Sequence, residues 1–182
     1  MDTISVIGLG YIGLPTALSL AVNGNPVIGT DYNKEVVDEL TNGSIHFTEE
    51  GLQELYEDAV KSEIKFTTNY CQANIYIIAV PTPYEKSNKK VDATYVINAV
   101  KEVLNVCKDE SIIVIESTIS PGTIDKYIRP LIIDRKVHLA HAPERIIPGN
   151  MIKELKNNSR TIGADSVVVA ERVKKLYSTF CK

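Results

Sequence analysis

The segment from residue 4 to residue 31 constrains the fold more than any other part of this sequence. An apolar, β-branched run at 3–7 has the length of a buried strand, and it leads directly into a glycine-rich turn. The turn holds three glycines with the spacing G-x-G-x-x-G, namely Gly8, Gly10 and Gly13. Apolar residues then recur at helical spacing until Asn-Gly at 23–24 ends the helix, and a second strand at 26–29 leads to Asp31. The pattern predicts a strand–helix–strand unit.

This unit has the features of a dinucleotide-binding site. Glycines let the backbone approach a pyrophosphate, the helix N-terminus stabilises its charge, and an acid about 20 residues further on holds a ribose. The same glycine spacing also occurs in plain turns, so the interpretation depends on the two strands, the helix and the carboxylate together. Asp31 favours NAD over NADP, because a carboxylate binds ribose hydroxyls but repels a 2′-phosphate. Lys34 could bind such a phosphate, but its position near the start of a helix predicts that its side chain points to solvent.

The composition is that of an ordinary globular domain. The 182 residues are 44% hydrophobic and 24% charged, which is enough for one substantial core. The formal net charge of -3 gives no broad basic surface, so neither nucleic acid nor an anionic membrane is an expected partner. No apolar run approaches the ~20 residues of a membrane span, and the N-terminus has the pattern of a core strand instead of a signal peptide. A cytoplasmic location is therefore expected.

The cysteines and histidines show no pattern that holds a metal. The cysteines are odd in number, widely spaced and in no C-x-x-C arrangement: Cys71, Cys107 and Cys181. This argues against both a disulfide framework and a zinc site, and free thiols are expected. The histidines, also without a ligand pattern, are His46, His138 and His141.

Strand and helix signals alternate along the rest of the chain. Strands are expected at 64–67, 75–80, 112–115, 137–140 and 160–164. Amphipathic helices are expected around 36–40, 49–61, 92–107, 124–133, 151–155 and 169–180, with a polar, lysine-rich loop at 84–90. This alternation predicts a single α/β domain, residues 1–182, built on a doubly wound parallel sheet of the Rossmann type.

Two of the expected strands end in segments with chemically useful groups. In an open α/β sheet the carboxyl ends of the strands are where ligands bind. The strand at 75–80 ends in Pro81-Thr82-Pro83, which stops the strand and stiffens its exit. Thr118 follows the strand at 112–115 too early to cap the next helix, so it is expected to face the cleft. Thr123 could act as a helix cap.

A carboxylate and an arginine follow the strand at 137–140. Glu144 and Arg145 stand side by side, framed by Pro143 and Pro148. Adjacent charges on a loop are usually only solvated. The rigid frame favours a positioned pair at the ligand edge of the sheet instead.

Four motifs in this order resemble the N-terminal domain of the UDP-glucose/GDP-mannose dehydrogenase family: V-I-G-L-G-Y-I-G-L-P, A-V-P-T-P, E-S-T-I-S-P-G-T and A-P-E-R-I-I-P-G. The resemblance covers essentially the whole chain. Within the family, P-E-R-x-x-P-G and N-G-S-I-H-F-T-E-E-G-L resemble UDP-N-acetyl-D-mannosamine dehydrogenases, whereas UDP-glucose dehydrogenases typically carry P-E-F-L. The alternatives are dehydrogenases of UDP-N-acetylgalactosamine, UDP-N-acetylglucosamine or UDP-glucose, and an NAD-binding module without catalysis.

The resemblance implies a role for each motif. The residues that would contact NAD are Gly8, Gly10, Tyr11, Ile12, Gly13, Asp31, Pro81, Thr82 and Thr118. Members of the family oxidise an alcohol to a carboxylate with two NAD, through a thioester on a cysteine. Glu144 would then be catalytic and help to activate the hydrolytic water, and Thr118 would help to orient that water. Arg145 and Ile146 would line the UDP-sugar site.

The resemblance also implies two further regions of the family's proteins, and no segment of this sequence matches their motifs. Family members continue into a connecting helix with a catalytic lysine and asparagine, and then into a second domain that binds the UDP-sugar and carries the nucleophilic cysteine. Their dimer contacts lie mainly in that continuation, so a homodimer is expected of the full-length protein. The chain also has Ser159-Arg160 and Gly163-Ala164 where the family often has Asp-Arg and Gly-Gly.

Overall fold

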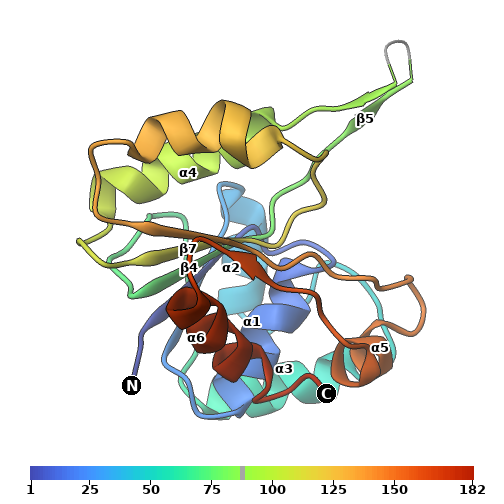
Figure 1. Ribbon diagram of the computed structural model, residues 1–182. Coiled ribbons are helices and arrows are strands. Elements are labelled where there is room, and N and C mark those ends of the chain that lie inside the picture. The colour runs from blue at the N-terminus through green and yellow to red at the C-terminus, as the bar shows by residue number, and fades with distance from the viewer. Residues whose placement is uncertain (87–88) are drawn as a thin grey trace.

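The computed structural model describes residues 1–86 and 89–182, and within them seven strands form one sheet (Figure 1). In order across the sheet the strands are β3 (Lys65–Thr67), β2 (Val27–Thr30), β1 (Ile4–Ile7), β4 (Ile75–Ile78), β7 (Ile112–Ile115), β8 (His138–His141) and β9 (Gly163–Ala164). From β1 the chain steps outward to β3, returns to the centre at β4 and steps outward on the other side. The doubly wound sheet predicted from the sequence is therefore confirmed.

One edge strand departs from the parallel prediction. All strand pairs from β3 to β8 are parallel, whereas β9 pairs antiparallel with β8. A parallel strand needs a crossover that carries the chain back to the end of the sheet where the other strands begin. The helix α5 (Met151–Asn157), which connects β8 to β9, lies beyond the carboxyl ends of the strands instead (Figure 1). The chain therefore enters β9 at the carboxyl end of β8 and runs antiparallel to it.

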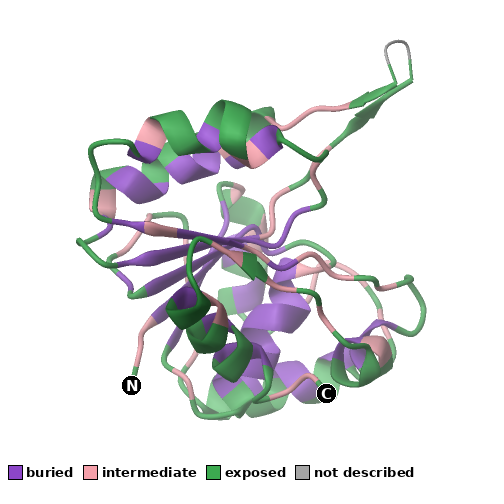
Figure 2. Cartoon of the chain, viewed as in Figure 1, coloured by how far each residue is buried: buried purple, intermediate pink, exposed green. Residues whose placement is uncertain are grey.

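Side chains alternate between the two faces of the sheet, and a separate hydrophobic cluster covers each face. Along β4, Ile75 and Ile77 belong to one cluster, and Tyr76 and Ile78 belong to the other. The first cluster is covered by α1 (Gly13–Val22), α2 (Lys34–Thr41), α3 (Leu52–Lys61), α5 and α6 (Val167–Tyr177). The second is covered by α4 (Thr94–Val106), η1 (Ile124–Ile128) and η2 (Arg129–Ile132). Figure 2 shows the buried positions along the central strands and on the helix sides that face them. Cover on both faces explains why β4 and β7 consist of Ile, Val and Tyr alone.

The helix expected at 124–133 is irregular. It begins as a π-helical turn, η1, and continues as a 3-10 turn, η2. Pro130 lies in η2 and has no N–H to donate, so a regular α-helix cannot run through this position. Thr123 precedes η1 and is buried, but its side chain makes no capping hydrogen bond. The capping role considered for Thr123 is therefore wrong.

The segment expected to be a loop at 84–90 contains a β-hairpin. β5 (Tyr84–Glu85) pairs antiparallel with β6 (Lys90–Val91), while residues 87–88 of the expected loop lie outside the described residues. The pairing sets Glu85 opposite Lys90, and opposite charges at facing positions stabilise a strand pair. Figure 1 shows the hairpin projecting away from the helical layers.

Candidate active site

A cavity of about 640 Å³ lies at the carboxyl ends of β1 and β4, where the winding of the sheet reverses. In doubly wound sheets ligands bind at this switch point. Most of the site residues predicted from the sequence line the cavity: Gly8, Gly10, Tyr11, Ile12, Asp31, Pro81, Thr82, Thr118 and Glu144. Gly13, Arg145 and Ile146 do not line it.

The three glycines of the turn have different structural roles. Gly8 has a φ of 91°, and a Cβ there would lie 2.8 Å from the carbonyl oxygen of Ala79. A Cβ on Gly13 would lie 1.8 Å from the carbonyl oxygen of Gly8, so only glycine lets α1 begin this close to β1. A Cβ on Gly10 would meet no protein atom within 4 Å, so packing within the described protein does not require glycine there. Open space over this backbone is what a pyrophosphate needs, and the turn therefore fits a dinucleotide.

Asp31 connects the end of β2 to the glycine turn. Its Oδ2 accepts a hydrogen bond from the N–H of Leu9 at 2.8 Å, and its Oδ1 accepts one from the N–H of Asn33 at 2.9 Å. Each carboxylate oxygen keeps further acceptor capacity, so the group can also accept from ribose hydroxyls. The Lys34 side chain is 78% exposed and pairs with Asp38. It points to solvent, as predicted, and leaves Asp31 as the charged group at this end of the cavity.

Several wall residues are not evident from the sequence. Aromatic and polar side chains at the exit of β3 and on α4 line the cavity, namely Tyr70, Tyr95, Asn98 and Glu102. The helical spacing of the last three residues is a signal that could have found them. The segment 42–51, between α2 and α3, contributes His46. Its neighbour Phe47 stacks on Tyr11 of the glycine turn, with ring centroids 4.4 Å apart.

A serine fixes the exit of β7 beside the exit of β4. The Ser117 hydroxyl lies 3.2 Å from the carbonyl oxygen of Ile78 and 2.7 Å from that of Val80, and it donates to these oxygens. Thr118, the next residue, lines the cavity. The position predicted for Thr118 is therefore confirmed.

Glu144 is a partly buried carboxylate at the cavity wall. It accepts a hydrogen bond from the N–H of Ile146 at 2.6 Å. Burial raises the pKa of Glu144 above its ordinary value, although the N–H of Ile146 and the charge of Arg160 oppose the increase. A raised pKa brings a carboxylate closer to the range of an effective general base near neutral pH.

The neighbouring Arg145 is not part of a positioned pair. Its side chain is exposed, and the described residues form no ion pair between Arg145 and Glu144. Arg145 and Ile146 border a separate hollow of about 10 Å³. The predicted pair of positioned charges is therefore wrong. The backbone N–H of Ile146 holds the Glu144 carboxylate, and the Arg145 side chain does not contribute.

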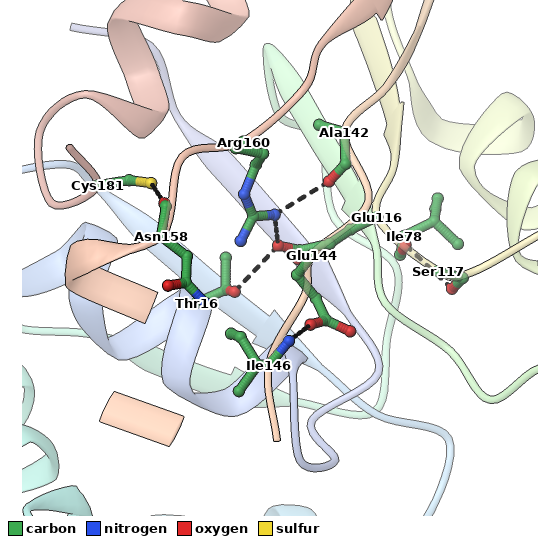
Figure 3. A network of polar contacts seen from close by, with 10 residues as sticks. All are labelled: Thr16, Ile78, Glu116, Ser117, Ala142, Glu144, Ile146, Asn158, Arg160 and Cys181. Atoms are coloured by element: carbon green, nitrogen blue, oxygen red, sulfur yellow. Dashed lines mark hydrogen bonds and ion pairs between the residues drawn. The ribbon is translucent and has the colours of Figure 1, made fainter. Parts of the chain in front are cut away.

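A different carboxylate and arginine form a buried ion pair beside the cavity (Figure 3). Oε1 of Glu116 contacts Nη1 of Arg160 and accepts from the Thr16 hydroxyl at 3.2 Å. Nη1 of Arg160 also donates to the carbonyl oxygen of Ala142 at 3.0 Å, and the guanidinium lies 4.3 Å from the centroid of the Tyr177 ring. Glu116 lines the cavity and is 1% exposed. Burial raises the pKa of Glu116, and Arg160 opposes this increase.

The part of the chain that the structure describes has no cysteine at the cavity, no metal-binding cluster and no membrane-spanning helix. The three cysteines are free, and none of them lines the cavity. Among residues 1–86 and 89–182, no three His, Cys, Asp or Glu side chains are grouped to hold a metal ion. No helix in the same residues is long and apolar enough to cross a membrane.

The strand order, the glycine turn at the switch point and the acid at the end of β2 define a dinucleotide-binding domain. The chain belongs to the UDP-glucose/GDP-mannose dehydrogenase family, and the model of that family's NAD-binding domain matches residues 2–181. NAD, the cofactor expected from Asp31, is the cofactor of this family domain.

The relatives it matches are about twice as long. A UDP-N-acetyl-D-mannosamine dehydrogenase of Methanococcus maripaludis is 44% identical over 181 residues, which are 97% of this chain and 42% of that protein. The structure of the UDP-N-acetyl-mannosamine dehydrogenase Cap5O from Staphylococcus aureus is 37% identical, with a TM-score of 0.93 over 99% of this chain and 46% of that one. The structure of a UDP-glucose dehydrogenase from Pyrobaculum islandicum is 26% identical, with a TM-score of 0.87 over 99% of this chain and 44% of that one. The chain thus spans less than half the length of these relatives.

Proposed function

We propose that this chain is the NAD-binding part of a UDP-N-acetyl-D-mannosamine 6-dehydrogenase, which oxidises the sugar alcohol in two steps to a carboxylate. The observation that carries the proposal is a single cavity that joins Glu144 and Thr118 to the glycine turn and Asp31. The sugar is inferred from the P-E-R-I-I-P-G motif and from the higher identity to mannosamine dehydrogenases, 44% and 37%, than to the UDP-glucose enzyme, 26%.

The residues around the cavity fit NAD. Gly8, Gly10 and Gly13 shape the turn that would hold the pyrophosphate, with Tyr11 and Ile12 beside it. Asp31 would accept from the ribose hydroxyls. Further contacts would come from the strand exits, through Pro81, Thr82 and Thr118. Bound there, NAD supplies the hydride acceptor for each oxidation.

The protein's own groups would act on water and on the sugar. Glu144 would remove a proton from the water that hydrolyses the acyl intermediate, a task that its raised pKa suits. The hydroxyl of Thr118 would orient that water. Arg145 and Ile146 would contact the UDP-sugar, completed by the second domain that the family resemblance implies.

We expect NAD to bind at least about 10-fold more tightly than NADP. Asp31 would accept charge-assisted hydrogen bonds from the ribose, each worth roughly 1.5 to 3 kcal/mol, but would repel a 2′-phosphate. Isothermal titration calorimetry with both cofactors measures the ratio. Asp31→Ala should weaken NAD binding and reduce the preference, whereas Asp38→Ala, on the exposed face of α2, should leave both unchanged. Equal affinities for the two cofactors would contradict this role of Asp31.

We expect the 182-residue chain alone to bind NAD but to oxidise no UDP-sugar. Two oxidations that end in a carboxylate need a nucleophile that holds the aldehyde for the second hydride transfer. None of Cys71, Cys107 and Cys181 lines the cavity. Incubation with NAD and UDP-N-acetylmannosamine should give no increase in NADH absorbance. Sustained turnover would mean that the nucleophile is in this chain, and Cys71 would be the first residue to replace.

The proposal includes the pathway, the cellular location and the oligomeric state of the enzyme. A UDP-uronic acid is a building block for surface polysaccharide, and its synthesis from cytosolic UDP-sugars and NAD suits a cytoplasmic enzyme. We propose a homodimer for the protein that contains this domain, with contacts in the segment that follows it in the family.

A further inference from the structure

The segment 42–51 lies between the cofactor cavity and the loop that carries Glu144. On one side, His46 lines the cavity and Phe47 stacks on Tyr11 of the glycine turn. On the other side, the segment ends against the residues that follow β8. The sequence motif N-G-S-I-H-F-T-E-E-G-L falls in this segment, and the functions assigned above do not use it.

Glu49 makes the direct connection between the two parts. Its Oε2 accepts a hydrogen bond from the N–H of Gly149 at 2.9 Å, and its Oε1 accepts one from the N–H of Met151 at 2.9 Å. The partners are 100 and 102 residues away in the sequence. Both bonds are charge-assisted, since the acceptor is a carboxylate. A single side chain thus joins the segment 42–51 to the end of the Glu144 loop.

The other side-chain hydrogen bonds of this loop are local. Glu144 accepts from Ile146, and the Glu154 carboxylate accepts from the N–H of Ile147 at 2.8 Å. Asn158 donates to the carbonyl oxygen of Arg145 at 2.9 Å. The loop and α5 therefore form one local unit. Among the hydrogen bonds of residues 1–86 and 89–182, those of Glu49 are the ones that tie residues 143–151 to the chain before β8.

Packing beside Glu49 supports the same connection. Gly51 has a φ of 76°, and a Cβ placed there would lie 3.9 Å from Cγ2 of Ile152, in the first turn of α5. Leu52 and Ile152 are both buried in the hydrophobic cluster on this face of the sheet. The backbone at Gly51 therefore lies near Ile152, beside the hydrogen bonds of Glu49.

We propose that Glu49 is a positioning residue that holds the loop 143–150, and with it Glu144, against the cofactor cavity. The carboxylate does this from a segment that is itself anchored on the glycine turn through Phe47 and Tyr11. Glu49 touches neither reacting group, so its effect is exerted through the loop. The catalytic consequence rests on the proposed function, whereas the structural consequence does not.

The structural consequence is tested in the 182-residue chain with Glu49→Ala and the matched control Glu50→Ala. Glu50 is the adjacent carboxylate, it is exposed, and the structure shows no hydrogen bond from its side chain to a described residue. In Glu49→Ala the amides of Gly149 and Met151 should exchange with solvent about 10-fold faster or more, measured by NMR. The Glu144 carboxyl should titrate at a lower pH, since its pKa is raised by burial that the released loop loses. Affinity for NAD should change by less than about twofold.

Glu49→Gln keeps the size of the side chain and one good acceptor, so the two amides should exchange at an intermediate rate. This variant also provides the test if the alanine variant does not fold. Unchanged exchange at both amides, an unchanged titration of Glu144, or the same changes in Glu50→Ala would each overturn the proposal.

The catalytic consequence is tested in an enzyme that joins this domain to the remaining half of the family's chain. Glu49→Ala should lower kcat about 10-fold with the KM for NAD unchanged, whereas Glu50→Ala should match the wild type. An unaltered kcat would overturn the positioning role. If no UDP-sugar is oxidised even by the wild-type enzyme, the proposed function fails, while the exchange and titration experiments still decide whether Glu49 holds the loop.

Discussion

Replacing Glu144 by glutamine should stop the enzyme after the first hydride transfers and leave a covalent adduct on the nucleophile. In an enzyme that joins this domain to a cysteine-bearing domain, we expect a burst of NADH followed by a steady rate lower by about 10² to 10⁴-fold. The reason is that glutamine keeps the shape of the side chain but cannot accept the proton of the hydrolytic water. Stopped-flow absorbance at the NADH band measures the burst, and mass spectrometry of the intact protein detects the adduct.

Glu171→Gln is the matched control, because this glutamate on α6 is exposed and lies away from the cavity. It should turn over like the wild type. A Glu144→Gln variant that shows no burst and no longer binds NAD would make Glu144 a structural residue instead of a base.

Replacing Arg160 by glutamine should destabilise the domain by about 3 to 5 kcal/mol. The side chains of Arg160 and Glu116 are 6% and 0% exposed, and Arg160 contacts Oε1 of Glu116. Oε2 of Glu116 has no hydrogen-bond partner among the described residues. Without the guanidinium, the carboxylate stays buried and uncompensated. Since a domain of this kind is stable by only about 5 to 15 kcal/mol, the variant should lose a large part of its stability. Equilibrium unfolding in urea measures the difference.

Two further variants separate the buried charge from other causes. Arg172→Gln breaks an exposed ion pair with Asp2 and should cost less than about 1 kcal/mol. The double variant with Glu116→Gln and Arg160→Gln removes both charges and should be more stable than Arg160→Gln alone, because no charge is then left unpaired. If the double variant is no more stable than Arg160→Gln alone, the unpaired charge of Glu116 is not the cause of the loss.

Features carried by neighbouring residues could be read from the sequence. The glycine turn, the helix after it and Asp31 lie within one strand–helix–strand unit, so their spacing fixes their relation in space. The exits of β4 and β7 could also be assigned to the ligand edge, because apolar runs such as 112–115 mark the ends of buried strands. The proline in η2 was visible in the sequence too, but the π-helical and 3-10 geometry of the turns η1 and η2 was not.

The sequence by itself determined the alternation of strands and helices, the glycine turn and the position of Asp31, since hydrophobic periodicity and turn residues act over short distances. Only the tertiary structure decided which distant side chains meet. Glu116 pairs with Arg160 across 44 residues, and Glu49 reaches Gly149 across 100. Each contact joins segments that are far apart in the sequence, and no local pattern encodes which side chains meet at the carboxyl ends of the strands. For the same reason the arginine beside Glu144 in the sequence, Arg145, is exposed, while the arginine whose charge acts on Glu144 is Arg160.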